Sequence, residues 1–193
     1  MMSVSEAAEF NQLIDDAKRA IESVRDLEPH IHEAVSVLVT SIKFGGKVMA
    51  CGNGGSAADS AHFTTELLCR FENDRKPLAA IALTQDGSFL TAVGNDYSYD
   101  KVFSRQVEGL AREHDVLVVL STSGNSPSII EAIHSAKRHG IKTIALLGRD
   151  GGNARGMADV EIIVPVKSTA RIQEAHKFVI HAFCRLLEKR LFG

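Results

Sequence analysis

The stretch Lys47-Val-Met-Ala-Cys-Gly-Asn-Gly-Gly-Ser56 predicts a short buried strand that runs into a loop of small residues and then into a helix. A second stretch, Val116-Leu-Val-Val-Leu-Ser-Thr-Ser-Gly-Asn-Ser126, has the same organisation. Backbone N–H groups at a helix start, together with small hydroxyl groups, bind phosphates and sugar hydroxyls well. Two such loops therefore predict a polyhydroxylated, phosphorylated ligand.

Strand and helix patterns alternate after residue 46, and the strands are continuously apolar, which is typical of a parallel sheet covered on both faces. We expect strands at 47–50, 79–83, 116–120, 142–147 and 160–164, and helices at 56–70, from 86, at 100–112, 126–140 and 170–191. The prediction is an α/β fold: a three-layer, doubly wound, five-stranded parallel sheet in the flavodoxin-like order 2-1-3-4-5. In that order both loops lie at the switch point, where such sheets bind ligands.

Residues 1–193 are predicted to form a single domain, because 193 residues is an ordinary domain size. Helical periodicity covers 8–24 and 31–44, so helices at about 5–44 are expected to pack on the sheet domain and to make oligomer contacts. A net charge of -2 argues against nucleic acid and membrane surfaces as partners. Three scattered cysteines and the lack of an apolar leader indicate a reduced, cytoplasmic protein.

The two loops also admit two other interpretations. Gly52-x-Gly54-x-x-Ala57 fits a loose dinucleotide pattern, but the next strand ends at Leu83-Thr84-Gln85 without the acidic residue that a ribose requires. The second loop could simply cap a helix. A cap needs one hydroxyl, whereas three stand in a row from Ser121, so anion binding is favoured.

A possible metal site combines two helices. His62 and Glu66 share a helix face at i, i+4 spacing, as metal ligands often do. On the last helix, spacing favours Glu174 over Gln173 as the partner of His181, because i, i+7 keeps one face and i, i+8 diverges. Exposed His–Glu pairs are also common as solvated neighbours, so spacing alone leaves the metal open.

Four stretches together resemble the phosphoheptose isomerase (sedoheptulose 7-phosphate isomerase) family of the sugar isomerase, or SIS, fold. They are Cys51-Gly-Asn-Gly-Gly-Ser-Ala-Ala-Asp-Ser-Ala-His-Phe-Thr-Thr-Glu66, Val93-Gly-Asn-Asp96, Ser121-Thr-Ser-Gly-Asn-Ser126 and Arg171-Ile-Gln-Glu-x-His176 with His181. They occur in the family's order, and the resemblance covers nearly the whole chain. It departs at Ser168-Thr169-Ala170, where some members carry an acidic residue, so no carboxylate role is carried over there.

The resemblance implies one zinc ion per subunit and a cytoplasmic homotetramer with sites shared between subunits. The implied zinc ligands are His62, Glu66, Gln173 and His181. The implied substrate contacts are Asn53, Gly54, Gly55, Ser56, Glu66, Asn95, Asp96, Ser121, Thr122, Ser123, Ser126 and Gln173. Glu66 is the expected base and His181 the expected acid. A zinc-bound carboxylate is a weaker base, so whether Glu66 acts as ligand, base or both stays open.

The function expected from the resemblance is aldose–ketose isomerisation. Sedoheptulose 7-phosphate would be converted to D-glycero-D-manno-heptose 7-phosphate through a zinc-assisted enediolate, for heptose and lipopolysaccharide core biosynthesis. One alternative is a non-catalytic adaptor of the same fold that binds the bacterial replication initiator, but such a protein needs no catalytic carboxylate and imidazole, and this chain keeps His62, Glu66, Gln173 and His181 together. Another is an isomerase of a pentose or hexose phosphate, which the two loops would suit equally well.

Overall fold

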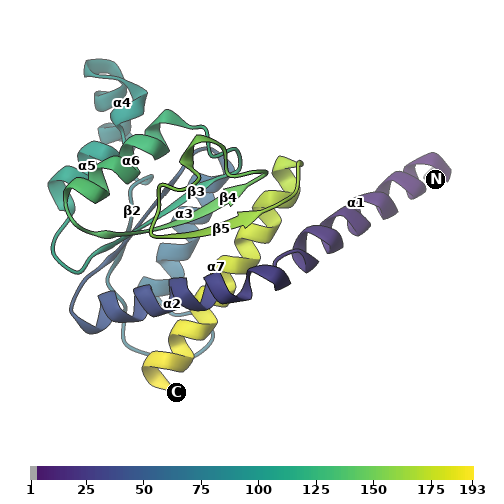
Figure 1. Cartoon of the computed structure of the whole chain (residues 1–193), viewed down its shortest axis with the longest axis horizontal. Coiled ribbons are helices and arrows are strands. Elements are labelled where there is room, and N and C mark those ends of the chain that lie inside the picture. Colours follow the sequence, from purple (N-terminus) through teal and green to yellow (C-terminus); the bar gives the residue numbers. More distant parts are fainter. Residues whose placement is uncertain (1–3) are drawn as a thin grey trace.

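Five parallel strands pair in the order β2-β1-β3-β4-β5 in the computed structural model, which describes residues 4–193 (Figure 1). The strands are β1 (Val48–Gly52), β2 (Ala80–Ala82), β3 (Val116–Ser121), β4 (Lys142–Gly148) and β5 (Val160–Val164). The register pairs Gly52 of β1 with Leu120 of β3, so the two Gly/Ser loops leave the sheet side by side. The predicted fold class is confirmed.

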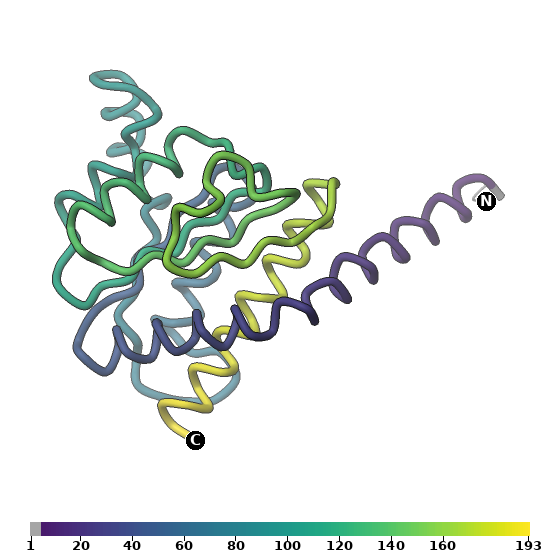
Figure 2. The backbone as a smooth tube through the Cα atoms, in the orientation of Figure 1, coloured from purple at the N-terminus to yellow at the C-terminus, as the bar shows by residue number. Residues whose placement is uncertain are grey.

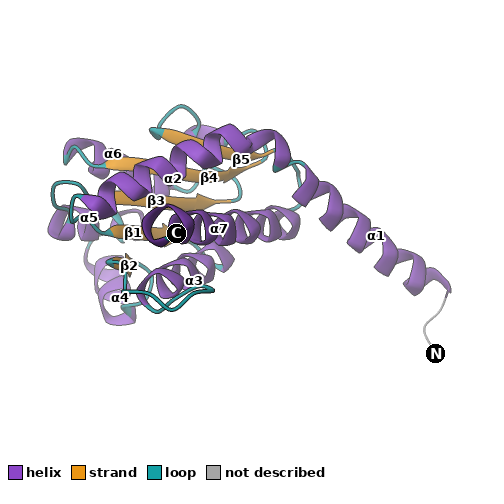
Figure 3. Cartoon of the chain, turned by 90° about the horizontal axis from the view of Figure 1, so that it is seen from below, coloured by secondary structure: helices purple, strands orange, loops and turns teal. Residues whose placement is uncertain are grey.

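Helices cover both faces of the sheet (Figures 1 and 3). The helices are α1 (Val4–Glu22), α2 (Glu28–Lys43), α3 (Gly55–Leu68), α4 (Gly87–Asp96), α5 (Ser104–Leu110), α6 (Pro127–Arg138) and α7 (Thr169–Phe192). One apolar core lies between the sheet and α2, α3 and α7, and a second lies under α4, α5 and α6. Alternate strand residues feed the two cores, as the period of a β-strand requires. None of the helices in residues 4–193 is long and apolar enough to cross a membrane.

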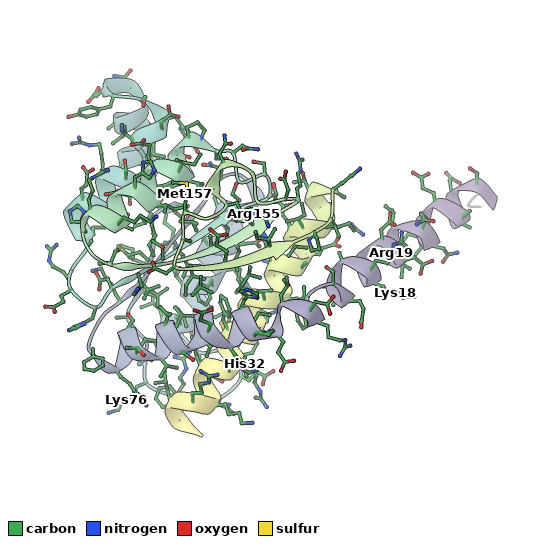
Figure 4. All side chains as sticks on the ribbon, in the orientation of Figure 1. Lys18, Arg19, His32, Lys76, Arg155 and Met157 are labelled. Atoms are coloured by element: carbon green, nitrogen blue, oxygen red, sulfur yellow. The ribbon has the colours of Figure 1, made fainter. Side chains whose placement is uncertain are left out.

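The first helix departs from the rest, because most of α1 projects beyond the domain (Figure 2). Lys18 and Arg19 lie on this projecting part and are exposed (Figure 4). The C-terminal half of α1 is anchored, because Ala20 is buried and the Arg171 guanidinium donates to the Leu13 carbonyl at 2.7 Å. The N-terminal helices therefore differ: α2 packs on the domain core and α1 reaches outwards.

Several element boundaries differ from the predicted ones. The helix expected at 100–112 is a 3-10 turn, Tyr99–Lys101, followed by α5, because Val102 and Phe103 turn into the core between them. The second helix begins at Glu28, since Pro29 is well suited to a first helical turn. The edge strand β2 has three residues, because it pairs with β1 alone.

Candidate active site

The first loop leaves the start of α3 open. Gly54 has φ +56° and ψ -122°, a conformation reserved for glycine, and no side chain caps the first N–H groups of α3. Gly55 follows, and a Cβ there would lie 2.3 Å from Nε2 of Gln173 on α7. The glycines thus allow the loop to turn and allow Gln173 to lie directly against the helix start. Ser56 is buried behind them.

The second loop presents hydroxyl groups whose positions are fixed. Ser121 Oγ accepts the Gly124 N–H at 3.0 Å, and Ser123 Oγ accepts the Asn125 N–H at 3.2 Å. Each serine keeps its own proton for donation, because a hydroxyl both accepts and donates. Ser126 precedes α6 without making a side-chain cap bond, and Pro127 occupies the first turn as predicted. Pro127 has no N–H group, and the Ser126 carbonyl accepts the N–H groups of Ile129 and Ile130, so the groups that this loop offers to an anion are mainly hydroxyls.

One amide side chain joins the two loops. Asn53 of the first loop donates from Nδ2 to Oγ of Ser128, at the start of α6, at 3.0 Å. Its Oδ1 accepts the hydroxyl of Tyr99 at 2.8 Å. Both ends of the amide are thereby engaged, which fixes its orientation and the spacing of the loops. Tyr99 was not predicted from the sequence, because no local pattern marks an exposed tyrosine in a 3-10 turn as a loop contact.

The packing of α3 against α7 brings two distant histidines together. Phe63 and Phe183 are fully buried between these helices, with ring centroids 6.1 Å apart. Beside them, His62 Nε2 lies 3.0 Å from His181 Nε2, across 119 residues of sequence. Glu66 Oε1 lies 3.5 Å from His62 Nε2. The predicted convergence of His62, Glu66 and His181 is therefore present in the structure of one chain.

The His181 imidazole is held towards its neutral form. Its pKa is lowered by partial burial, and the neighbouring His62 ring and Lys177 lower it further, while Glu66 acts in the opposite direction. Lys177 itself is paired with the buried carboxylate of Asp59 on α3, at 2.5 Å. A neutral imidazole is the form that binds a metal or accepts a proton.

The donor set suits zinc, which binds imidazole nitrogen and carboxylate oxygen. Ligand atoms around a tetrahedral zinc ion lie about 3.3 Å apart, close to the 3.0 Å and 3.5 Å that separate His62 from its two neighbours. Within residues 4–193, however, no three His, Cys, Asp or Glu side chains are grouped so that they would hold an ion by themselves. The chain therefore provides a preformed histidine pair with a carboxylate at its edge.

Four other residues considered for the site lie apart from this pair. Gln173 contacts Gly55, and eight residues of α7, about 12 Å, separate it from His181. Glu174, which spacing had favoured, is exposed and pairs with Arg171 at 2.6 Å. Asn95 and Asp96 end α4, are exposed and bond to each other at 2.8 Å. In the described part of the chain no hydrogen bond links them to either loop.

Two cations near the second loop are absent from the sequence prediction. Arg149 and Lys167 line a hollow of about 650 Å³ together with Asn125. Arg149 has φ +61°, which is uncommon for a residue with a side chain. Arg149 follows β4 and Lys167 follows β5, so no pattern within the two Gly/Ser loops indicates either cation. They add positive charge beside the anion-binding groups.

Comparison with known proteins shows the class of protein to which this chain belongs. The family model of the SIS domain matches residues 12–148. Phosphoheptose isomerase from Citrifermentans bemidjiense is 51% identical over 167 residues, which cover 86% of this chain and 87% of that protein. The solved phosphoheptose isomerase of Neisseria gonorrhoeae has a TM-score of 0.86 and 46% identity, covering 95% and 96% of the two chains. That of Francisella tularensis has a TM-score of 0.91 and 39% identity, covering 98% and 100%.

The chain belongs to the phosphoheptose isomerase family, and it is therefore an aldose–ketose isomerase. The resemblance drawn from the four sequence stretches is confirmed. Family membership also explains why both loops are kept open, since an isomerase of this kind acts on a sugar phosphate.

Proposed function

We propose that the enzyme interconverts sedoheptulose 7-phosphate and D-glycero-D-manno-heptose 7-phosphate, and so supplies heptose for the lipopolysaccharide core in the cytoplasm. The observation that supports this most directly is the Glu66–His62–His181 cluster on the same helix pair as the open start of α3. From Gly55 to His62 is about 10 Å along α3, comparable with the length of an extended sugar phosphate. The groups that face the sugar hydroxyls and the proton-transfer groups are thus spaced for one ligand.

The residues divide the work of binding and proton transfer. The hydroxyls of Ser121, Thr122, Ser123 and Ser126 hold the phosphate, and the start of α3 faces the sugar hydroxyls. Holding the remote phosphate orients C1 and C2 and lowers the entropic cost of reaction. Glu66 removes the proton from one carbon and returns it to the neighbouring carbon, while neutral His181 relays a proton between the two oxygen atoms.

A zinc ion held by His62, Glu66 and His181 would act as a Lewis acid that polarises the carbonyl and hydroxyl oxygens. The resemblance adds Gln173 as a fourth ligand, and Gln173 lies eight residues from His181 on α7. The metal is tested separately from turnover. Purified protein should contain about one equivalent of zinc per subunit, and in competition with a chelator His62→Ala should lower its affinity by more than the roughly 10- to 100-fold that loss of a residue bonded to a ligand costs. Gln173→Ala should weaken zinc binding if Gln173 is a ligand. Active protein without stoichiometric metal, unaffected by chelators, would remove zinc from the proposal.

The assignment of base and acid rests on two conservative variants. Glu66→Gln and His181→Gln should each abolish turnover of sedoheptulose 7-phosphate while leaving the thermal unfolding midpoint within a few degrees of wild type. Both keep the approximate volume of the side chain, so loss of activity reports chemistry rather than packing. Near-normal turnover by either variant would reject its assigned role.

A substrate panel decides between sugar phosphates. The enzyme should turn over the seven-carbon ketose phosphate with a higher kcat/KM than pentose or hexose analogues, because the correct chain length fills both loops at once. A higher value for a shorter sugar would reassign the substrate and keep the isomerase chemistry. Failure on every sugar, with capture of the replication initiator, would favour the adaptor function.

The projecting helix supports the proposed tetramer. Phe10, Leu13 and Ile14 form an exposed apolar stripe on α1, and most of α1 lies outside its own domain. Large exposed side chains of this kind usually mark a protein interface. Replacing all three by serine should convert a tetramer into smaller species in light scattering, while substitution of exposed Lys18 by serine should not. An unchanged mass would place the interface elsewhere.

A further inference from the structure

A buried ion pair lies directly below the Glu66–His62–His181 cluster. Arg75 Nε is 3.0 Å from Glu188 Oε1, and each side chain is only 3% exposed. Neither residue belongs to the four sequence stretches that identify the family here. Burying two charges is costly unless further hydrogen bonds satisfy them, so the other contacts of this pair show what it does.

Arg75 caps the end of the helix that carries Glu66. Its Nη2 donates to the Glu66 carbonyl at 2.7 Å and its Nη1 donates to the Leu67 carbonyl at 2.8 Å. These carbonyls belong to the last turn of α3 and have no partner within the helix. A guanidinium also opposes the negative end of the helix dipole. The backbone that carries the Glu66 carboxylate is therefore fixed by Arg75.

Glu188 fixes the other side of the cluster through Phe71. Its carboxylate accepts the N–H groups of Phe71 at 3.2 Å and Asn73 at 3.3 Å, in addition to Arg75. The Phe71 ring then lies with its centroid 5.5 Å from that of His181. The centroid of the His181 ring also lies 5.2 Å from that of His62. The imidazole of His181 is thus in contact with a phenylalanine and a histidine.

We propose that Arg75 and Glu188 are positioning residues of the isomerase, which set Glu66 and His181 in their working geometry through the end of α3 and through Phe71. This proposal rests on the proposed function of those two residues. Arg75 and Glu188 do not touch the substrate, because both are enclosed beneath the cluster. Their effect is on the alignment of proton transfer and on the geometry of the histidine pair.

The test compares Glu188→Gln with the neighbouring exposed variant Glu72→Gln. The amide keeps the size of Glu188 but turns a donor towards N–H groups that need an acceptor. Glu72 lies in the same loop as Phe71 and Asn73 and pairs with Arg185 of α7. Both side chains of this pair are more than half exposed, so Glu72→Gln is a matched control. We expect kcat of Glu188→Gln to fall about 10- to 100-fold with KM changed less than about twofold. The control should stay within about twofold in both.

A spectroscopic measurement separates positioning from general destabilisation. In zinc-free protein with carbon-13 labelled histidine, the ring resonances of His181 should shift in Glu188→Gln and in Phe71→Leu, but not in Glu72→Gln. Phe71→Leu keeps the backbone N–H that donates to Glu188. It therefore tests whether the Phe71 ring positions His181, even if Glu188→Gln does not fold. Wild-type kcat together with unshifted His181 resonances in a folded variant would overturn the proposal.

The two proposals fail in different ways. If wild-type enzyme does not isomerise sedoheptulose 7-phosphate, the proposed substrate is wrong, whereas the His181 resonances still report whether Glu188 and Phe71 set its ring. If the wild type is active and neither variant moves kcat or the resonances, the ion pair serves folding alone.

Discussion

Replacing Gly124 by alanine tests whether the second loop is held in shape by close backbone contact. Gly124 has φ +65°, and a Cβ there would lie 1.8 Å from the Gly151 carbonyl oxygen. Gly140, after α6, offers a matched control with φ +66° and no atom within 4 Å of the position of a Cβ. The two substitutions share the same backbone strain and differ only in the contact.

The magnitudes follow from these two contributions. A left-handed conformation costs alanine about 1–2 kcal/mol, which is the expected loss for Gly140→Ala. The overlap at Gly124 cannot be relieved by a flexible side chain, because the atoms it meets are backbone, so the 148–154 segment must move. Overpacking of this kind adds about 1–3 kcal/mol. We expect Gly124→Ala to lose about 2–5 kcal/mol in total.

Urea unfolding at constant temperature measures the unfolding free energies of the two variants. Steady-state kinetics give KM, which reports whether the second loop still binds the substrate. At about 2–4 °C per kcal/mol, thermal midpoints should fall by about 2–8 °C for Gly140→Ala and further for Gly124→Ala. Only Gly124→Ala should raise KM for the phosphorylated substrate, because it displaces the Ser121 and Ser123 hydroxyls. Equal stability losses, or an unchanged KM for Gly124→Ala, would refute the contact argument.

Three further outcomes follow from single contacts. Tyr99→Phe should raise KM about 2- to 10-fold with little change in unfolding free energy, since it removes one exposed hydrogen bond to Asn53. An unchanged KM would show that this hydrogen bond does not affect substrate binding. Native protein should react with iodoacetamide at exposed Cys69 alone, because Cys51 and Cys184 are buried and burial raises the pKa of Cys184 to about 12. Mass spectrometry of native and urea-unfolded protein counts the modified cysteines. Modification of Cys184 in the native protein would contradict the prediction. Hydrogen bonds from Phe71, Asn73 and Arg75 lower the pKa of Glu188 despite its burial, so its contribution to the unfolding free energy is present above the unfolded-state pKa of about 4.3 and is lost as pH falls through the folded-state pKa. The unfolding free energy measured in urea from pH 6 to pH 3 should therefore depend less on pH in Glu188→Gln than in wild type. Parallel curves for the two proteins would contradict this.

Local patterns were sufficient to predict the fold. Apolar strands such as 116–120 and the glycine and proline signals around them determine the element order, and the parallel order follows from alternation. Boundaries failed where tertiary packing decides, as at Val102 and Phe103, which turn into the core and interrupt an otherwise helical run. Periodicity records which residues are apolar, and it cannot tell a buried turn from a buried helix face.

The site was predictable only where its residues share one element or one loop. His62 and Glu66 are one turn apart, and the hydroxyls from Ser121 onwards are contiguous, so both signals are visible in the sequence. Arg75 and Glu188 are 113 residues apart and have no motif around them. Their pairing depends on how the segment after α3 folds back over α7, which no local spacing encodes.

The two halves of the isomerase site are aligned by core packing, because their contacts advance in step along α3 and α7. Gln173 lies against Gly55, His181 against His62, and Phe183 against Phe63, so the two helices run in the same direction. A shift of one helix by a turn would break the phenylalanine contact, and truncating such a buried phenylalanine to alanine typically costs about 3–5 kcal/mol. The free energy that folds this face of the sheet therefore also fixes the separation between the anion-binding loop and the proton-transfer groups. For this reason a mild substitution of the buried Phe183 should lower kcat in steady-state kinetics before it unfolds the protein.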